Sequence, residues 1–501
     1  MTYVVALVLS VGSIVAGAVL AARGRRMDIA EWSVGGRRFG SVLFWFLMVG
    51  ETFTTFALLG ASQGVYVDGA PGYYVLGTVV LTASLGYWIA PRIWRAGRDQ
   101  GLLTEGDYFA RRFDAPWLGL VLALFGIAAL LLYARVQLTG LALILQTLLG
   151  SALSGTWYVV VAGALVVAFI FTGGMRSAAF GAVVKDIALV VVLLVIALTA
   201  AGAAGVHGWY GIFDAVAAKH PAAATLPGIT GAADRSVWWW GSFLLLSPLG
   251  AFVLPHAFQV YFTAKDARTI RRNQVVQPLY SLFYVFIIVI ALAALLADPG
   301  LGGPDANGSL LVFVRTHSPD WLVGLLAGAG ILVALVPTAV LMLTCGSLFS
   351  RNVYRVVRKD ASDARQMRVG RIAVVVVTAL AVGFTLLQAE TLVNVMVAVY
   401  DTVTQLAPAL VLSLVWRRTT AAGVLAGLLT GIVCLVVPPV TDALTALVPA
   451  GTVAGLPALV LNTVVAVVVS RATRAPSPDA VAVGMPPVDP PAARQDVGHG
   501  R

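Results

Sequence analysis

The chain has 501 residues, of which 59% are hydrophobic and only 11% are charged, and its mean hydropathy is +0.91. This composition is typical of a polytopic membrane protein and excludes a soluble enzyme. The formal net charge of +10 does not indicate nucleic-acid binding, because the basic residues lie in short loops between apolar runs rather than on one face or in one tail.

Apolar segments that could each cross a bilayer follow one another along the chain. We count thirteen, at residues 2–22, 41–67, 72–91, 117–149, 156–173, 180–205, 237–262, 275–297, 320–350, 372–388, 391–416, 421–438 and 456–470. Of the 33 Lys and Arg, only Lys219, Arg235 and Arg315 fall in the loops on the N-terminal side, and Arg135 and Lys185 lie within segments. The positive-inside rule therefore predicts a cell-membrane protein with its N-terminus outside and its C-terminus in the cytoplasm.

The second segment places Gly50 and Glu51 near the middle of the bilayer, followed by the hydroxyls of Thr52, Thr54 and Thr55. A charge at that depth costs on the order of 2.5–3.5 kcal/mol, so segments that carry one usually line a solute or ion path. Glycine followed by hydroxyls also favours a helix that stops and restarts. We interpret Glu51 as a proton carrier or as a carboxylate that caps the break. The threonines are candidate ligands for the solute or a cation, unless they bond to their own helix.

The fourth segment carries Arg135 at its centre, with Gln137 two residues further on. A mid-membrane arginine demands a counter-charge or a polar cavity. Its two-pronged guanidinium suits a substrate carboxylate, and the alternative is a structural ion pair with Glu51 or Asp401. We place Arg135 and Gln137 among the candidate substrate-binding residues.

The seventh segment contains Ser247-Pro248, Gly250 and Pro255-His256. Two prolines and a glycine remove backbone hydrogen bonds, so the sequence predicts a second interrupted helix here. Ser247 is a candidate ligand at this break, or a hydroxyl bonded within its own helix. His256 either titrates during transport or is a hydrogen-bonded packing histidine.

Two further polar pairs lie within apolar segments. Asp401 and Gln405 are four residues apart and share one helix face. We interpret them as residues of ion coupling or gating, or as a polar contact that satisfies the backbone of a neighbouring broken helix. Lys185 and Asp186 are expected near the inner surface, where they would lock two helices together. The sequence shows no phosphate loop, nucleophile motif or convincing metal site, so we predict that the protein is not an enzyme.

Interrupted segments stand second and seventh among the thirteen. If the first segment is an anchor, the core divides into five plus five helices, the spacing of an inverted-repeat transporter. We therefore divide the chain into an N-out anchor helix and basic loop, the first five-helix repeat, an extracellular loop, the second repeat, two peripheral helices and a disordered cytoplasmic tail. Their bounds are 1–40, 41–205, 206–236, 237–416, 417–473 and 474–501.

Short motifs recur along the chain in a recognisable order. They are Gly-Gly-Met-Arg at 173–176, Val-Lys-Asp ending at 186, Pro-His at 255–256, Thr-Ile-Arg-Arg-Asn at 269–273, Gln-Pro-Leu-Tyr-Ser at 277–281, Leu-Val-Pro at 335–337, Arg-Asn-Val-Tyr-Arg at 351–355 and Asp-Thr-Val-Thr-Gln at 401–405. Together they resemble the sodium:solute symporter family from Met1 to about Ser470, and within it the bacterial monocarboxylate permease-like branch. The resemblance implies an all-α membrane protein of the leucine-transporter type that takes up short carboxylates such as pyruvate, lactate or acetate.

The coupling cation implied by this resemblance is H+ or Na+, with no covalently bound cofactor. Sodium-coupled relatives carry paired hydroxyl residues where this chain has Val336 and Pro337, so the sequence favours the proton. We predict a cation-coupled symporter that imports a small organic solute, most simply a monocarboxylate. The alternatives are a symporter for another solute such as an amino acid, and a transporter-like membrane sensor. The expected partners are the solute, the cation and the lipid bilayer, without nucleic acid.

Overall fold

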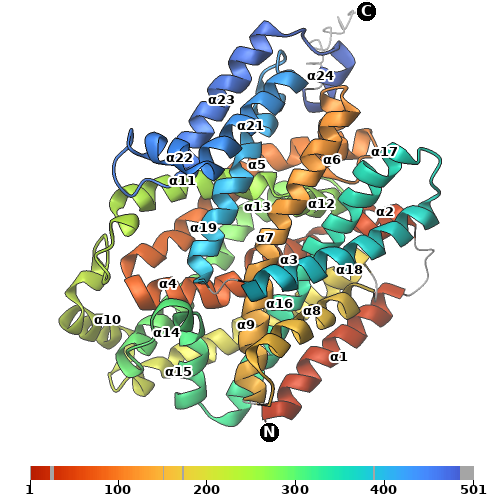
Figure 1. Cartoon of the computed structure of the whole chain (residues 1–501). Helices are drawn as coiled ribbons and strands as arrows, with labels where there is room; N and C mark the ends of the chain where they lie inside the picture. The colour runs from red at the N-terminus through yellow and green to blue at the C-terminus, as the bar shows by residue number, and fades with distance from the viewer. Residues whose placement is uncertain (1, 23–27, 151, 172–173, 388–389, 486–501) are drawn as a thin grey trace, which may run out of the picture.

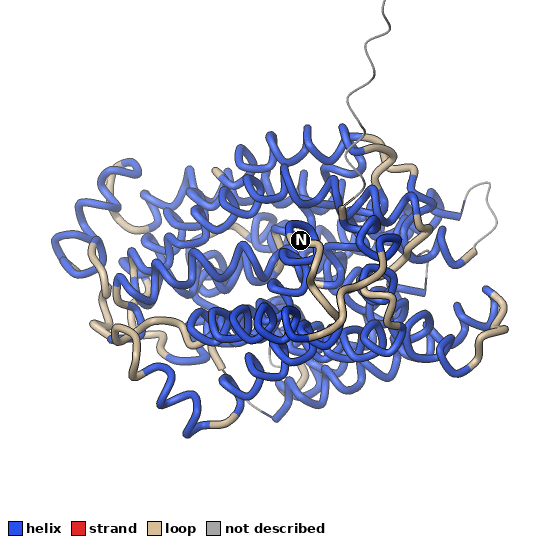
Figure 2. Tube along the Cα trace, turned by 90° about the horizontal axis from the view of Figure 1, so that it is seen from above, coloured by secondary structure: helices blue, strands red, loops and turns tan. Residues whose placement is uncertain are grey.

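Helices account for nearly all of the described chain (Figure 1; Figure 2). The structure is a computed structural model, and it describes residues 2–22, 28–150, 152–171, 174–387 and 390–485. Within these described residues, eight helices are long and apolar enough to cross a membrane, three bent pairs pass the same test together, and two shorter helices are also apolar. These elements coincide with the thirteen predicted segments, so the prediction of an all-α polytopic protein is confirmed.

The first part of the bundle begins with α1 (Thr2–Ala22) and the short α2 (Ile29–Val34). A bent helix and four further helices follow. They are α3 (Ser41–Thr52) with the π-helical turn η2 (Phe56–Gly60) and α4 (Ala61–Asp68), then α5 (Tyr74–Asp99), α7 (Pro116–Leu149), α8 (Gly155–Phe171) and α9 (Gly174–Ala203).

The second part also opens on a bent helix. Its members are α11 (Val237–Val253) with α12 (Pro255–Thr263), α13 (Ala267–Ser281) with α14 (Phe283–Ala297), α16 (Asp320–Leu348), α18 (Asp363–Leu387), and α19 (Leu392–Val403) with η8 (Thr404–Leu406) and α20 (Ala407–Val415). The last helices are α21 (Ala421–Val436), α22 (Pro438–Thr445), α23 (Gly455–Ala472) and α24 (Pro478–Gly484).

Shorter helices connect the spans at the two ends of the bundle. They are η1 (Gly35–Arg37), η3 (Ala70–Tyr73), α6 (Glu105–Arg112), α10 (Gly208–Lys219), η4 (Pro221–Ala224), η5 (Ala233–Arg235), η6 (Gly303–Gly308), α15 (Ser309–His317), η7 (Phe349–Tyr354) and α17 (Arg355–Val357). We call the end that carries α10 and α15 the α10 end, and the opposite end, with α2, α6 and α17, the α6 end (Figure 1).

Helix α16 lies at the centre of the bundle, and 94% of its most apolar window is buried. It contacts α1, α7, α9 and α18. Its sequence is apolar around the whole circumference, which is the pattern of a helix enclosed by other helices.

The two predicted interruptions are confirmed, since α3 and α4 meet at 50° and α11 and α12 at 58°. The second bend lies at Leu254, directly before Pro255 in the predicted stretch, whereas α11 runs without interruption through Pro248. Membrane helices tolerate an internal proline when neighbouring groups satisfy the freed carbonyl. Leu254 instead has extended backbone angles, as expected for a residue that precedes a proline.

The predicted disordered tail begins at residue 474, but the structure forms α24 within it, so the prediction is wrong for this stretch. Ser477 caps the helix by accepting a hydrogen bond from the Ala480 amide (3.3 Å), and Pro478 occupies its first turn. Helix α24 packs against α6, a contact that local composition does not reveal. The remainder of the tail, 486–501, lies outside the described residues.

Candidate functional site

A cavity of about 130 Å³ lies where the two bent helices meet. The first bend contributes Glu51, Thr52 and Thr54 to its wall, and the second contributes Leu254 and His256. Each bend exposes backbone polar groups that a continuous helix would have used internally. The cavity therefore combines backbone and side-chain polarity within the bundle.

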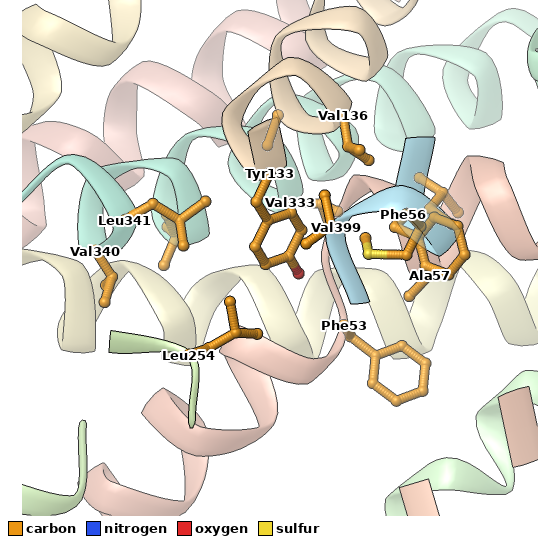
Figure 3. Close-up of a cluster of buried hydrophobic side chains, with 14 of the residues drawn as sticks. Phe53, Phe56, Ala57, Tyr133, Val136, Leu254, Val333, Val340, Leu341 and Val399 are labelled. Atoms are coloured by element: carbon orange, nitrogen blue, oxygen red, sulfur yellow. The ribbon is translucent and has the colours of Figure 1, made fainter. Parts of the chain in front are cut away.

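Hydroxyl, amide and aromatic side chains from five other helices complete the wall. They include Tyr74 and Thr78 of α5, Tyr133 of α7, Gln277 of α13, Tyr284 of α14 and Tyr400 of α19. Tyr133 extends from α7 between Leu254 and Phe53, which mark the two bends (Figure 3). Such a wall suits a small solute that has a polar end and an apolar remainder.

Glu51 and His256 face each other across the cavity, with 3.9 Å between Oε2 and Nε2. Their side chains are only 9% and 6% exposed. Among the described residues, neither Glu51 Oε1 nor His256 Nδ1 has a hydrogen-bond partner. Because buried polar atoms are normally satisfied, these two atoms are available to a bound solute, ion or water.

The predicted threonines separate into two groups. Thr52 and Thr54 line the cavity. Thr52 accepts a hydrogen bond from Gln277 Nε2 (2.9 Å) and donates one to the Met48 carbonyl (3.1 Å). Thr54 Oγ1 accepts the Phe56 amide (3.2 Å), which holds the restarting backbone in place.

Thr55 and Gln137 lie together behind the wall of the cavity and do not line it. The structure therefore does not place either residue where it could make the predicted direct contact with the solute. The Thr55 amide donates to Gln137 Oε1 (3.2 Å), and the Thr55 hydroxyl bonds to the same oxygen. Gln137 thus fastens the first bend to α7. Ser247 also lies behind the cavity wall, and its hydroxyl shares a 3.0 Å hydrogen bond with Thr78 of that wall.

Arg135 is not among the residues that line the central cavity, and the structure brings it to Glu390 rather than to the expected partners, Glu51 or Asp401. Its guanidinium lies 3.9 Å from Glu390, beside a second cavity of about 240 Å³. Residues two apart on a helix point in nearly opposite directions, since each residue turns the helix by about 100°. Tyr133 faces the central cavity, so Arg135 faces away from it.

Asp401 and Gln405 join α19 and η8 to α23. Asp401 Oδ1 accepts the Gly455 amide (3.1 Å), Gln405 Nε2 donates to the Gly455 carbonyl (3.1 Å), and Asn462 Nδ2 donates to the Gln405 carbonyl (2.8 Å). The structure thus places this pair in a polar interhelical contact. Their role in ion coupling stays a prediction.

Lys185 and Asp186 form a buried pair at the first bend, where the sequence did not lead us to expect them. Lys185 Nζ donates to the carbonyls of Gly50 (3.0 Å) and Phe53 (2.8 Å) and lies 2.7 Å from Asp186 Oδ1. We expected the pair near the inner surface because the apolar run starts at residue 180. Helix α9 begins at Gly174, so Lys185 lies about 16 Å along it, roughly half of a ~30 Å hydrocarbon core.

The sequence profile of the sodium:solute symporter family matches residues 32–431. The chain is 32% identical over 467 residues to an uncharacterized symporter of Bacillus subtilis, YhjB, covering 91% of this chain and 94% of that protein. It is 29% identical over 406 residues to a monocarboxylate transport permease protein of Rhizobium johnstonii, covering 80% of this chain and 81% of the relative.

Solved structures share the fold at low sequence identity, among them two transporters. A Na+-coupled sialic acid symporter, captured substrate-bound and outward-open, superimposes with a TM-score of 0.76 at 14% identity, over 95% of this chain and 98% of its own. Mhp1, a nucleobase-cation-symport-1 family transporter, gives a TM-score of 0.57 at 13% identity, over 91% and 99%. The predicted leucine-transporter-type fold is therefore confirmed.

Proposed function

Because the chain belongs to the sodium:solute symporter family, we propose that this cation-coupled symporter imports a short monocarboxylate by alternating access. The observation that carries the proposal is the cavity at the two helix bends, with Glu51 and His256 in its wall. Bent helices that meet around a central site are the usual construction of solute and ion sites in transporters with broken helices.

The cavity suits the carboxylate end of such a solute. The first turn of α12 lines it with His256 and Ala257, and a helix N-terminus carries a partial positive charge that favours anions. His256 Nδ1 is buried without a hydrogen-bond partner among the described residues. Tyr133 and Tyr284 offer ring faces to the apolar part of the solute. The monocarboxylate permease of Rhizobium johnstonii supports the same substrate class.

Glu51 supplies the reason for coupling. A carboxylate solute in this cavity meets the Glu51 carboxyl, and two carboxylates in one buried site repel each other unless a proton or another cation binds with them. Solute binding and cation binding therefore favour each other, which is the thermodynamic requirement for symport.

We further propose that the α6 end of the bundle faces the cytoplasm and that the N-terminus is outside. Basic side chains gather at the α6 end. Arg37 bonds the Leu102 carbonyl, Arg112 Nε donates to the Ser413 carbonyl (3.0 Å), and Arg351 pairs with Asp107 (3.2 Å). The positive-inside rule supports this orientation.

The test is uptake by the purified protein in liposomes. Radiolabelled pyruvate, L-lactate, acetate and, as a contrasting class, L-alanine are offered with sodium and pH gradients imposed separately. We expect accumulation of at least one monocarboxylate and no accumulation of alanine. The Glu51→Gln variant should lose accumulation, whereas Glu390→Gln, a matched change outside the central cavity, should retain it. Failure of wild type to accumulate any of the acids contradicts the proposed substrate class, and normal accumulation by Glu51→Gln contradicts the role of Glu51.

A further inference from the structure

The first bend leaves carbonyl groups at the end of a half-helix. The Phe53 amide still donates a hydrogen bond to the Val49 carbonyl (2.8 Å). The next carbonyl along α3, that of Gly50, instead accepts a hydrogen bond from Lys185 Nζ. The Phe53 carbonyl accepts the same nitrogen. A helix C-terminus carries a partial negative charge, and such carbonyls are the groups that hold coupling cations in transporters with broken helices. Here they hold an ammonium group.

The surroundings of this ammonium group favour a tethered cation over a free one. Lys185 and Asp186 are 0% and 1% exposed. Gly181 lies one turn before Lys185 on the same face of α9, and a Cβ added there would be 3.0 Å from Val336 Cγ2. The Thr338 hydroxyl donates to the Ala334 carbonyl of its own helix. Helix α16 thus presents the Val336 methyl group near the bend. The hydroxyl nearest to Val336 in sequence, that of Thr338, already donates a hydrogen bond within its own helix.

Other titratable groups near the pair come from several helices. Glu51 of α3 interacts electrostatically with both Lys185 and Asp186, and Tyr280 of α13 interacts with Asp186. Tyr284 of α14 interacts electrostatically with Tyr280. In the first turn of α9, Arg176 pairs with Glu31 of α2 (3.4 Å), and α1 carries no charged side chain. Glu51 and Tyr284 also line the cavity, and of these two Glu51 is the one that carries a carboxyl group.

We propose that the Lys185 ammonium is a tethered cation that replaces a coupling alkali ion at the first bend, and that coupling runs through its proton. This inference rests on the proposed symport and specifies its ion. In the loaded state, Nζ carries three protons and binds Gly50, Phe53 and Asp186. To release the ion, one N–H bond breaks and the proton forms an O–H bond on the Asp186 carboxylate, leaving a neutral amine and a neutral acid. The acid then gives the proton to water on the cytoplasmic side.

The consequence for the bend follows from the charge. A hydrogen bond from an ammonium group is roughly twice as strong as one between neutral groups. Loss of the proton therefore weakens the two bonds that hold the end of α3 to α9. The half-helix can then move relative to its neighbour, and a change in protonation becomes a change in the shape of the solute site.

The first experiment uses the wild-type protein and needs no solute. Equilibrium binding of radioactive sodium to the purified protein is measured across the millimolar range. We expect no saturable binding. In liposomes, we expect a pH gradient alone to drive accumulation equally well when sodium is replaced by potassium or choline. Saturable sodium binding, or accumulation that requires a sodium gradient, overturns the inference.

The second experiment separates a transport role from a structural one. Lys185→Arg keeps a positive charge but holds its proton permanently. We expect solute exchange across the membrane without a gradient to stay within about twofold of wild type, and pH-driven accumulation to fall by about tenfold or more. Arg176→Lys, a change between the same residue types on the same helix, should leave both activities unaltered. Normal pH-driven accumulation by a folded Lys185→Arg protein overturns the inference.

A third variant, Lys185→Ala, exposes the Gly50 and Phe53 carbonyls and the Asp186 carboxylate. We expect it to gain sodium binding that wild type lacks. If this variant does not fold, as judged by size-exclusion chromatography, the wild-type sodium measurement still decides. If the wild-type protein takes up none of the acids, the proposed function is refuted. The sodium-binding measurement then still decides the role of Lys185.

Discussion

Replacing Lys185 by methionine should destabilise the protein far more than replacing both members of its pair. Lys185→Met leaves the Asp186 carboxylate in a site where it is 1% exposed. Removing one partner of a buried ion pair typically costs about 3–5 kcal/mol, because the remaining charge is uncompensated. The carbonyls of Gly50 and Phe53 also lose their donor, at about 1–3 kcal/mol for each one that stays unsatisfied.

The double variant Lys185→Met/Asp186→Asn removes both charges and retains only the loss at the carbonyls. We therefore expect it to be more stable than Lys185→Met by about 3 kcal/mol, although less stable than wild type. Thermal unfolding in detergent, followed by the fluorescence of the 12 tryptophans, measures the order.

An exposed pair on the same protein serves as the control. Arg98 and Asp99 lie 2.8 Å apart, but their side chains are 57% and 54% exposed, and such pairs contribute about 0–1 kcal/mol. Arg98→Met should therefore unfold close to the wild-type temperature. If Lys185→Met is as stable as the double variant, Asp186 is not carrying an uncompensated charge and the reasoning is wrong.

Three further changes test the placement of single residues. Arg135→Lys should leave solute affinity in a binding assay within about twofold of wild type, because the guanidinium faces Glu390 beside a separate cavity; a large loss contradicts this. Asp401→Asn should transport with unchanged ion dependence, since its side chain accepts the Gly455 amide; altered coupling would assign it a transport role. Burial raises the pKa of Glu105, which lies in α6 outside the spans, well above its usual 4.5. The contribution of the Glu105 carboxyl to folding stability is therefore present below about pH 4.5 and is lost as the pH rises through the raised pKa. Glu105→Gln should therefore gain in unfolding temperature relative to wild type as the pH is raised, and a difference independent of pH contradicts this.

Hydropathy by itself determined the spans of this protein and the class of its fold. In lipid every backbone polar group must be satisfied internally, so each apolar run has to become a helix. Departures from that rule are visible in sequence, because Gly50 with its hydroxyls and Pro255 are residues that interrupt helices. Glu51 and His256 were candidate site residues for the same reason, since each lies directly at an interruption, and the structure places both in the wall of the cavity.

The tertiary structure decided which way side chains point and how deep they lie. Tyr133 and Arg135 are two residues apart on α7, yet one lines the central cavity and the other lies beside Glu390. A helix with apolar residues on every side gives no pattern from which that rotation can be read. Because α9 starts at Gly174, Lys185 lies at the first bend and not at the membrane surface, where the sequence led us to expect it. Its contacts join residues more than a hundred positions apart in the chain, and helix packing alone brings them together.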